Sequence, residues 1–361
     1  MNKIIKKKIA ILYSGGKNFG GIEQYLLNLF ANYDKDLVDL HLLSLGEWPV
    51  IDKLRDLGCE INVFNGKRVS LKTIKQIGLY LTKNDFNLLV SQGTVANAYA
   101  RAISLIYKIP NLVTVHSTQS GDYSNLAVRA AFGLVEFTTR FPTAGYIAVS
   151  KFLKDQMVKS GISDKKISVI YNGLDFPWAK PRAHKRLILG SVGRLHPVKG
   201  YDLLIESFAK LRNERLRLRI AGAGEELGKL QALAFEMGVE KRVEFVGYQP
   251  DIYKFLDSVD VYIQSSKSEG FGLAVVEAMS QGIPVVVTPA GSLMEIVEDK
   301  KTGYICPEFC VNTLAKTIAL AVENYEDSKQ IGENAKEFVL KNFEVKKWAK
   351  KTIEKYLEFC K

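Results

Sequence analysis

Two glutamates that could bind hydroxyl groups, Glu269 and Glu277, stand eight positions apart beside a glycine-bearing turn. The stretch SEGFGLAVVEAM follows a predicted strand that ends near Gln264, and it predicts a loop and then a helix that begins around Gly272. Eight residues along one continuous helix separate two carboxylates by about 12 Å, which is too far for the closely opposed pair of a retaining hydrolase. The spacing favours two separate contacts along one extended ligand, although two surface carboxylates near a helix start would also fit it.

The start of the same helix could bind a phosphate. Its first backbone amides, those of Phe271, Gly272 and Leu273, are predicted to point out of the helix without partners at its positive end. Gly270 and Gly272 would let the backbone approach an anion closely. We therefore expect an anion to bind at this helix start.

A second stretch places two cations after a predicted strand. Arg194 and Lys199 flank a turn in GSVGRLHPVKGYDLLIESFAKL, just beyond the expected strand end at Val192. A guanidinium binds phosphate oxygens through two parallel hydrogen bonds and an ammonium acts as a point charge, so the pair could neutralise a departing diphosphate. Two basic loop residues can equally be solvated without a role, and His196 between them is predicted to be an ordinary loop residue.

A third stretch, IAILYSGGKNFGGIEQYLLNL, predicts a strand, a glycine loop and a helix near the N-terminus. The loop glycines Gly15, Gly16, Gly20 and Gly21 do not follow the G-x-G-x-x-G spacing, and no acid ends the second strand to bind a dinucleotide ribose. A P-loop sequence is also missing. The loop is therefore weak evidence for a general approach site for an anion or a sugar, and the later AGAGEELG stretch is similarly weak and could simply turn the chain.

Two further motifs concern hydrogen bonding and metal binding. His116 ends a predicted strand in LVTVHST, where its imidazole could bond a sugar hydroxyl or assist at a reacting centre, or could simply be packed in place. Asp34-Lys35-Asp36 matches a D-x-D metal signature, but it lies between a helix and the start of a strand. We interpret it as a solvated turn, and we predict no metal and no cofactor.

The elements that must position these residues alternate between short β-branched strands and helical patterns such as Ile22–Tyr33 and Ala96–Tyr107. This order is typical of parallel sheets with helices on both faces, which bind ligands beyond the carboxyl ends of their strands. The predicted strands are Lys8–Tyr13, Val38–Leu43, Glu60–Val63, Asn87–Val90, Asn111–Val115, Gly145–Val149, Leu187–Val192, Leu216–Ala221, Val243–Val246, Val261–Gln264 and Pro284–Thr288.

A break in this rhythm divides the chain. Asn172–His184, NGLDFPWAKPRAH, has two prolines and no periodicity, and it predicts a linker. We expect two Rossmann-like domains, 1–173 and 174–343, that face a cleft. The amphipathic tail, 344–361, is expected to pack back on the first domain.

Composition narrows the class of protein. A length of 361 residues, 47% hydrophobic residues and 25% charged residues indicate a globular chain of two domains. The chain has no apolar stretch of about 20 residues, and the run Ile9–Tyr13 is too short for a signal sequence, so we expect a cytoplasmic protein. Cys59, Cys306, Cys310 and Cys360 lack a zinc-binding pattern and are expected to be free thiols.

The net charge of +11 is concentrated in the first half. Residues 1–182 hold 24 Lys and Arg against 14 Asp and Glu, a net +10, whereas residues 183–361 hold 26 against 25. Such a balance suits an anionic partner such as a membrane surface or a lipid pyrophosphate, and it also fits a merely soluble, lysine-rich surface. Nucleic acid is disfavoured because no binding motif accompanies the charge.

A predicted helix at Ser124–Phe141 bears on the same question. Arg129, Glu136 and Arg140 form a narrow polar stripe beside a broad apolar face. Such a helix could contact the inner face of the membrane or a lipid acceptor, and it could also be a core helix of the first domain.

Four stretches in order, GGIEQYLLNL, VIYNGLD, VGRLHPVKGYDLLIESF and EGFGLAVVEAM, resemble family-four glycosyltransferases, and the likeness is densest in 190–298. Members of that family have the GT-B fold and retain anomeric configuration. The resemblance implies that Arg194 and Lys199 bind the donor pyrophosphate with the amides of Phe271, Gly272 and Leu273.

It further implies that Glu277 holds the ribose, Glu269 orients the donor sugar, and His116 lies near that sugar. Gly20 and Gly21 would sit against the sugar diphosphate, and Asn172 and Gly173 match the stretch where the chain crosses between domains. One departure is Gln24, where many relatives carry Arg, so any acceptor or phosphate contact from that position is in doubt.

The implied activity is transfer of a hexose or N-acetylhexosamine from a nucleoside-diphosphate sugar to a glycan or lipid-linked acceptor. Uridine donors are favoured, followed by guanosine-linked mannose. The alternatives are a nucleotide-sugar epimerase, a phosphorylase that needs pyridoxal phosphate, and a non-catalytic nucleotide-sugar binder.

Overall fold

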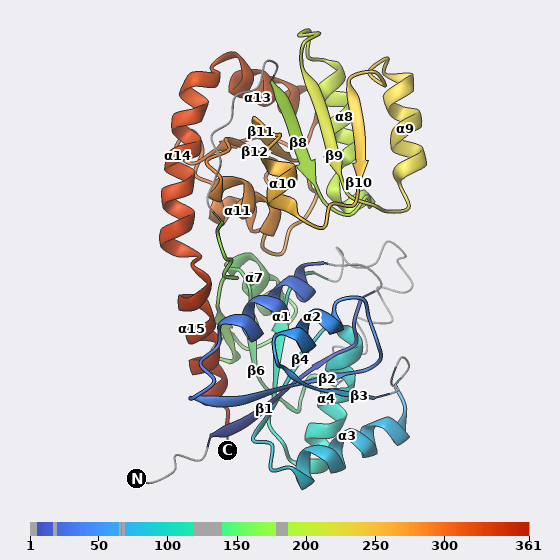
Figure 1. Cartoon of the computed structure of the whole chain (residues 1–361), viewed down its shortest axis with the longest axis vertical. Coiled ribbons are helices and arrows are strands. Elements are labelled where there is room, and N and C mark those ends of the chain that lie inside the picture. Colours follow the sequence, from blue (N-terminus) through green and yellow to red (C-terminus); the bar gives the residue numbers. More distant parts are fainter. Residues whose placement is uncertain are drawn as a thin grey trace. The chain divides into compact units, whose positions relative to one another are not determined.

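The computed structural model describes residues 6–16, 20–64, 66, 69–118, 139–177 and 187–360. The chain forms two units, each an α/β fold on one parallel sheet, which confirms the expected fold class (Figure 1). The first unit comprises Met1–Leu174 and Val345–Lys361, and the second comprises Asp175–Glu344.

The first unit contains a seven-stranded sheet in the order β3-β2-β1-β4-β5-β6-β7, and all neighbouring strands are parallel. Its strands are β1 (Lys7–Tyr13), β2 (Val38–Ser44), β3 (Glu60–Val63), β4 (Leu88–Gln92), β5 (Asn111–Val115), β6 (Thr143–Ala148) and β7 (Ile167–Val169). Its helices are α1 (Gly21–Asn32), α2 (Ile51–Asp56), α3 (Leu71–Lys83), α4 (Thr94–Tyr107), α7 (Lys151–Lys159), the 3-10 turn η1 (Asp164–Lys166) and α15 (Val345–Leu357).

The central strand β1 shows why the sequence forms this sheet. Its apolar residues from Ile9 to Tyr13 are all buried. Successive side chains on a strand point to opposite faces, so Ile9 and Ile11 join the core beneath α1 and α15, whereas Ala10 and Leu12 join the core beneath α3 and α4. A strand covered on both faces needs an uninterrupted apolar run, which is what the sequence provides.

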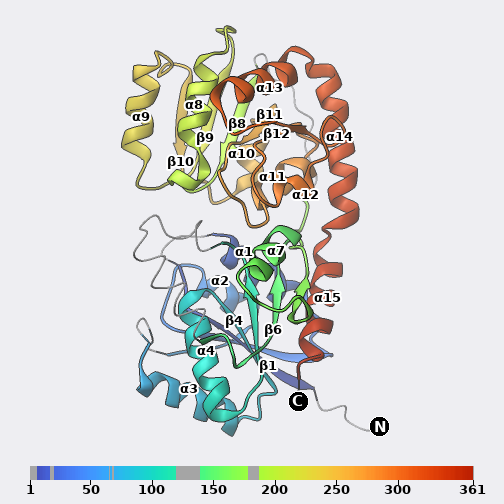
Figure 2. The ribbon, with the colours of Figure 1, turned by 180° about the vertical axis from the view of Figure 1, so that it is seen from behind.

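The C-terminal helix α15 belongs to the first unit and packs on α1 (Figure 2). The ring of Trp348 lies edge-on to that of Tyr25 on α1, with ring centroids 4.8 Å apart. Tyr25 Oη also lies 3.1 Å from Tyr356 Oη. A side chain at Gly173 would come within 2.4 Å of Trp348, so only glycine lets the chain pass beneath this helix.

The second unit contains a six-stranded parallel sheet in the order β10-β9-β8-β11-β12-β13. Its strands are β8 (Ile188–Val192), β9 (Arg217–Ala221), β10 (Val243–Gly247), β11 (Val261–Gln264), β12 (Val285–Val287) and β13 (Tyr304–Ile305). Its helices are the 3-10 turn η2 (Pro197–Lys199), α8 (Tyr201–Ala209), α9 (Leu227–Glu236), α10 (Ile252–Leu256), α11 (Leu273–Ser280), α12 (Leu293–Ile296), α13 (Val311–Glu323) and α14 (Tyr325–Asn342).

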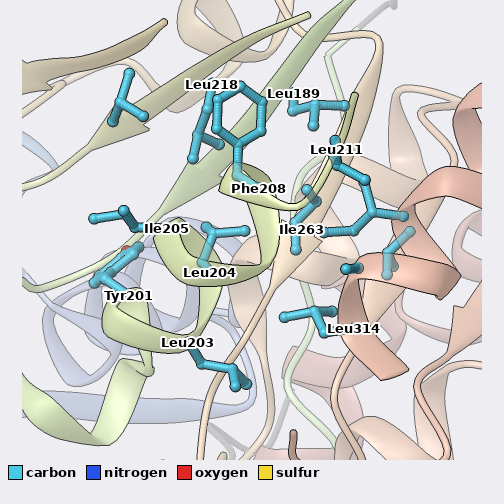
Figure 3. Packing of buried hydrophobic residues seen from close by; sticks show 14 of the residues in the cluster. Leu189, Tyr201, Leu203, Leu204, Ile205, Phe208, Leu211, Leu218, Ile263 and Leu314 are labelled. Atoms are coloured by element: carbon cyan, nitrogen blue, oxygen red, sulfur yellow. The ribbon is translucent and has the colours of Figure 1, made fainter. Parts of the chain in front are cut away.

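Helix α8 packs on the sheet and forms part of the core of this unit. Phe208 and Leu204 on α8 are fully buried and lie among Leu189, Leu218 and Ile263 from the sheet strands (Figure 3). The helix therefore fixes the η2 turn that precedes it, which carries Lys199.

The structure differs from the sequence predictions mainly at short elements. Strands β7 and β13, of three and two residues, were not predicted. Asn87 lies before β4, where its side chain accepts a hydrogen bond from the Lys8 amide at 2.9 Å. Residues 178–184 of the predicted linker and residues 124–138 of the predicted helix Ser124–Phe141 lie outside the described residues. No helix among the described residues combines the length and apolar character needed to cross a bilayer.

Candidate functional site

Glu269 is the centre of a buried cluster in the second unit. Its Oε1 accepts hydrogen bonds from Lys199 Nζ at 2.6 Å, Gln264 Nε2 at 2.9 Å and Ser266 Oγ at 2.6 Å. The Glu269 side chain is only 10% exposed, and a carboxylate that is removed from water requires such donors. No donor within the described part of the chain reaches Oε2, so this oxygen remains to meet a ligand.

The loop that carries Glu269 is held from two sides. Tyr262 Oη donates to Gln264 Oε1 at 2.7 Å, which directs the amide nitrogen of Gln264 toward Glu269. Thr288 Oγ1 donates to the carbonyl of Ser266 at 2.6 Å. The carboxylate is therefore positioned before any ligand arrives, and neither Gln264 nor Ser266 was predicted as a site residue.

The η2 turn brings Lys199 to this cluster. Gly200 ends the turn in the left-handed region at φ +63°, and a side chain there would lie 2.1 Å from the Ser265 carbonyl oxygen. Ser265 Oγ in turn donates to the Lys199 carbonyl at 3.0 Å. His196 accepts a hydrogen bond from the Val198 amide at 3.2 Å and so caps the turn, a role that the sequence did not indicate.

Arg194 lies just beyond β8 and is exposed. Among the described residues its guanidinium has no ion-pair partner. The loop is supported from beneath by two glycines, because side chains at Gly222 and Gly224 would come within 1.9 Å and 2.2 Å of the carbonyls of Gly193 and Leu195. The AGAG stretch therefore supports the Arg194 loop, although its sequence alone was weak.

Helix α11 begins without a side-chain cap. Gly272 is its N-cap at φ +85°, and a side chain there would lie 2.6 Å from Leu293. Leu273, the first residue of the helix, is partly exposed. The ring of Phe271 is buried against Phe343, with centroids 5.5 Å apart, so Phe271 offers only its backbone to a ligand. A positive helix end without a cap is suited to bind an anion.

Glu277 lies inside α11 and is buried. Burial raises the pKa of its carboxyl to about 7, because the charged form has lost its water. Among the described residues no donor pairs with this carboxylate, so a ligand that supplies hydroxyl hydrogens would stabilise the charged form.

The remaining predicted site residues belong to the first unit. Gly20 is the N-cap of α1, and its amide donates to Glu23 Oε2 at 3.0 Å. Tyr13 Oη donates to the other oxygen of Glu23 at 2.5 Å, and burial raises the pKa of this tyrosine, which keeps its proton. The Gly20 amide is thus already used inside the protein, and Gly21 is the first residue of the helix.

His116 follows β5 and packs edge-on against Tyr25, with ring centroids 4.9 Å apart. Its Nε2 lies 3.0 Å from Gln92 Oε1, which places the proton on Nε2 and leaves Nδ1 as an acceptor. Burial lowers the pKa of His116 to about 3, so the ring is neutral at ordinary pH. It can therefore bind a hydroxyl but does not act as a charged acid.

Gln24 and the Asn172-Gly173 stretch are linked within the first unit. Gln24 Nε2 donates to Asn28 Oδ1 at 2.7 Å, and Asn28 Nδ2 donates to the Gly173 carbonyl at 2.9 Å. Gln24, the residue that departs from the family pattern, therefore helps through Asn28 to hold the backbone at Gly173, just before the chain leaves the first unit.

Two further features of the sequence are the Asp34-Lys35-Asp36 motif and the cysteines. The Asp34-Lys35-Asp36 stretch is a turn between α1 and β2. Within the described residues, no group of three or more His, Cys, Asp or Glu could hold a metal ion. The four cysteines are free thiols, as expected.

The fold is shared with solved structures. The chain is similar over 98% of its length to HepE of Anabaena in complex with UDP and glucose, and the match covers 99% of that chain. The TM-score is 0.83 at 21% identity. Two Rossmann-like parallel-sheet units with this similarity are the GT-B fold.

Two family models match consecutive stretches of the sequence. The model described as Glycosyltransferase Family 4 matches residues 19–176, and the model described as Glycosyl transferases group 1 matches residues 175–338. Together these matches and the fold make the chain a GT-B glycosyltransferase similar to family four.

Relatives agree with this assignment. An uncharacterized glycosyltransferase of Methanocaldococcus jannaschii is 29% identical over 273 residues, which is 70% of each chain. The lipopolysaccharide core biosynthesis glycosyltransferase LpsE of Rhizobium meliloti is 32% identical over 156 residues, which is 43% of this chain and 45% of that one.

Proposed function

We propose that this glycosyltransferase moves a hexose or N-acetylhexosamine from a UDP-sugar to a glycan or lipid-linked acceptor, with retention of configuration and without a metal. The observation that carries the proposal is the Lys199–Glu269 cluster beside the uncapped start of α11. The UDP and glucose complex of HepE and the lipopolysaccharide role of LpsE support a UDP donor and a cell-surface glycan product. The proposed location is the cytoplasm, with peripheral contact to the inner face of the membrane.

In this proposal the donor is held by separate groups along its length. The diphosphate binds the first amides of α11 (Phe271, Gly272 and Leu273, with Gly270 allowing close approach) and the free guanidinium of Arg194. Glu277 accepts hydrogen bonds from the ribose hydroxyls, and Glu269 accepts one from the sugar through Oε2.

Transfer then proceeds on one face of the sugar. The bond from the anomeric carbon to the diphosphate breaks, the acceptor oxygen bonds to the same face, and a phosphate oxygen of the departing UDP takes the acceptor proton. Arg194 and Lys199 stabilise the negative charge that develops on the diphosphate. Because Lys199 is held by Glu269 before the donor arrives, its ammonium needs little reorganisation.

In the first unit, neutral His116 is proposed to bind a hydroxyl of the donor sugar through Nδ1. Gly20 and Gly21 are proposed to let the diphosphate pass close to the backbone. Because the Gly20 amide already donates to Glu23, its contribution would be space for the donor and not a hydrogen bond.

A thermal-shift panel tests the donor. UDP and UDP-sugars should raise the melting temperature more than GDP, GDP-mannose or uridine at equal concentration, because a ligand stabilises the state that it binds. Equal shifts from uridine and UDP would contradict the diphosphate site.

The preferred donor is then incubated with and without acceptor, and the product is analysed by NMR. Formation of an α-linked product from an α-linked donor supports retention, whereas inversion contradicts it. Conversion of the nucleotide sugar without any acceptor would indicate the epimerase instead.

A further inference from the structure

Helix α3 exposes leucines among lysines. Leu71 is 82% exposed and Leu79 is 52% exposed. Lys72, Lys75 and Lys83 are exposed on the same side of the helix, and α3 contains no acidic residue from its first position to its last. A single exposed leucine is ordinary, but two leucines flanked by three lysines, which outnumber the one exposed acid that follows the helix, Asp85, form a distinct surface.

The end of helix α4 lies beside α3 and also exposes apolar residues next to a lysine. Leu105 and Ile106 are 61% and 58% exposed, and Lys108 follows them at the surface. Tyr107 joins the two helices, because its ring fills the space beside Gly78 and its Oη donates to the Lys75 carbonyl at 3.4 Å. Both views show α3 beside this end of α4 (Figures 1 and 2).

The outward side chains do not support the fold of this region. The opposite side of α3 is anchored in the core by Ile74, Ile77 and Leu81. Ser70 caps the helix by accepting a hydrogen bond from the Thr73 amide at 3.2 Å. The helix is therefore formed before any partner binds, so its exposed face can dock without a folding cost.

We propose that this α3–α4 face, made by Leu71, Lys72, Lys75, Leu79, Lys83, Leu105, Ile106 and Lys108, docks on an anionic lipid bilayer. A helix with lysines around exposed leucines binds such a surface by two means, since the ammonium groups meet lipid phosphates and the apolar side chains enter the headgroup boundary. Positive charge without acids on α3 complements an anionic bilayer better than a neutral one. The surface would bring the enzyme to a lipid-linked acceptor, but it does not depend on the donor site or on the proposed reaction.

Vesicle flotation tests this directly. The full-length protein is mixed with phosphatidylcholine vesicles, alone or with 30% phosphatidylglycerol as a chosen test composition, at low and at high salt. Binding should require phosphatidylglycerol and should weaken at high salt because salt screens the charges. Equal binding to neutral vesicles, or no binding to either, would overturn the proposal.

Matched variants locate the surface. The triple variant Lys72→Glu, Lys75→Glu, Lys83→Glu should lose about 100-fold or more in vesicle affinity. The control variant Lys159→Glu, Lys165→Glu, Lys351→Glu makes the same change in net charge at exposed lysines elsewhere in the first unit, and it should lose much less. Equal losses in both would show that net charge alone drives binding, which contradicts the proposed face.

The apolar contribution is tested separately. Leu79→Ser should weaken vesicle binding about tenfold, whereas Leu340→Ser, at an exposed leucine on α14, should leave it unchanged. All variants should keep the wild-type thermal shift with UDP, which distinguishes failure of this surface from failure of the donor site. A dimer in sedimentation that is abolished by Leu79→Ser would assign the face to a second copy of the chain and overturn the proposal.

Discussion

The two units both contain a strand, a glycine-bearing loop and a helix, but the two helix starts are used differently. At α1 the protein supplies its own anion, because Glu23 accepts the Gly20 amide and is fixed by Tyr13. At α11 the nearby acid, Glu269, is turned toward Lys199, and the helix start has no side-chain cap. A positive helix end can be neutralised within the fold or left for a ligand, and of these two helix starts α11 is of the second kind.

This comparison separates two similar motifs, the glycine loops that precede α1 and α11. Both loops are rich in glycine, so sequence alone predicts an approach site for an anion at each. At α1 the acid three residues after Gly20 makes the difference, because the Glu23 carboxylate accepts the Gly20 amide, which is the one half of a capping box that a glycine N-cap allows. Binding of the donor diphosphate should therefore depend strongly on the start of α11 and weakly on the start of α1.

Removing the Lys199 ammonium should have the largest effect. Lys199→Ala should lower turnover ~10²-fold or more, because a group that stabilises developing charge is lost. Arg194→Ala should act in the same direction, whereas Lys210→Ala, at an exposed lysine after α8, should retain wild-type turnover. Steady-state kinetics with melting curves for each variant check this, and near-wild-type turnover in both site variants would refute the assignment.

Titration of Glu277 should make donor binding depend on pH. Burial raises the pKa of this carboxyl from 4.5 to about 7, so the folded state disfavours its ionisation. The contribution of Glu277 to the free energy of unfolding therefore falls as pH rises from 4.5 to about 7. Ribose hydroxyls favour the ionised form, so affinity for UDP-glucose should rise about tenfold from pH 6 to pH 8. Calorimetry should show this rise, and Glu277→Gln should abolish it; a wild-type affinity independent of pH would argue against the contact.

The two cap glycines should differ in their tolerance of a side chain. Gly272→Ala should reduce stability by about 2 kcal/mol, because alanine is strained at φ +85° and its Cβ would meet Leu293. Gly20→Ala should cost less than about 1 kcal/mol, because Gly20 is extended at φ −149° and the nearest atom is 3.2 Å away. Urea unfolding compares the two, and an equal loss would remove this part of the contrast.

Glu23→Gln should give the smallest effect on the donor site. It keeps the shape of the capping box but removes its charge, so stability should fall by about 1 kcal/mol while UDP affinity changes less than twofold. Melting curves and UDP titration are the measurements. A loss of affinity as large as that of Lys199→Ala would mean that α1 does take part in binding the diphosphate.

Much of the fold could be predicted from the sequence because long apolar runs carry a clear signal. The run Ile9–Tyr13 predicted a strand, and β1 contains it; the structure adds that this strand is central and buried. Strands β7 and β13 are too short for any periodicity to show, and they form only because neighbouring strands pair with them. The packing of the tail on the first unit followed from its apolar stripe, which the structure places against α1.

The sequence predicted individual site residues but not how their side chains contact one another. Sequence indicated Lys199 and Glu269 as separate contacts, whereas the structure pairs them directly across 70 positions. Gln264 and Ser266 were missed because each looks like an ordinary polar residue at a strand end. Their one signal is a run of polar residues, Gln264 to Ser266, at the end of a strand whose residues are all buried.

The central claim is that the start of α11, and not that of α1, binds the donor diphosphate. Hydrogen exchange of the full-length protein with UDP, with uridine and without ligand measures this at the backbone amides themselves. UDP should slow exchange in a peptide that spans 268–276, uridine should not, and a peptide that spans 14–24 should change little with either. Protection by UDP confined to 14–24, or equal protection of 268–276 by uridine, would contradict the account.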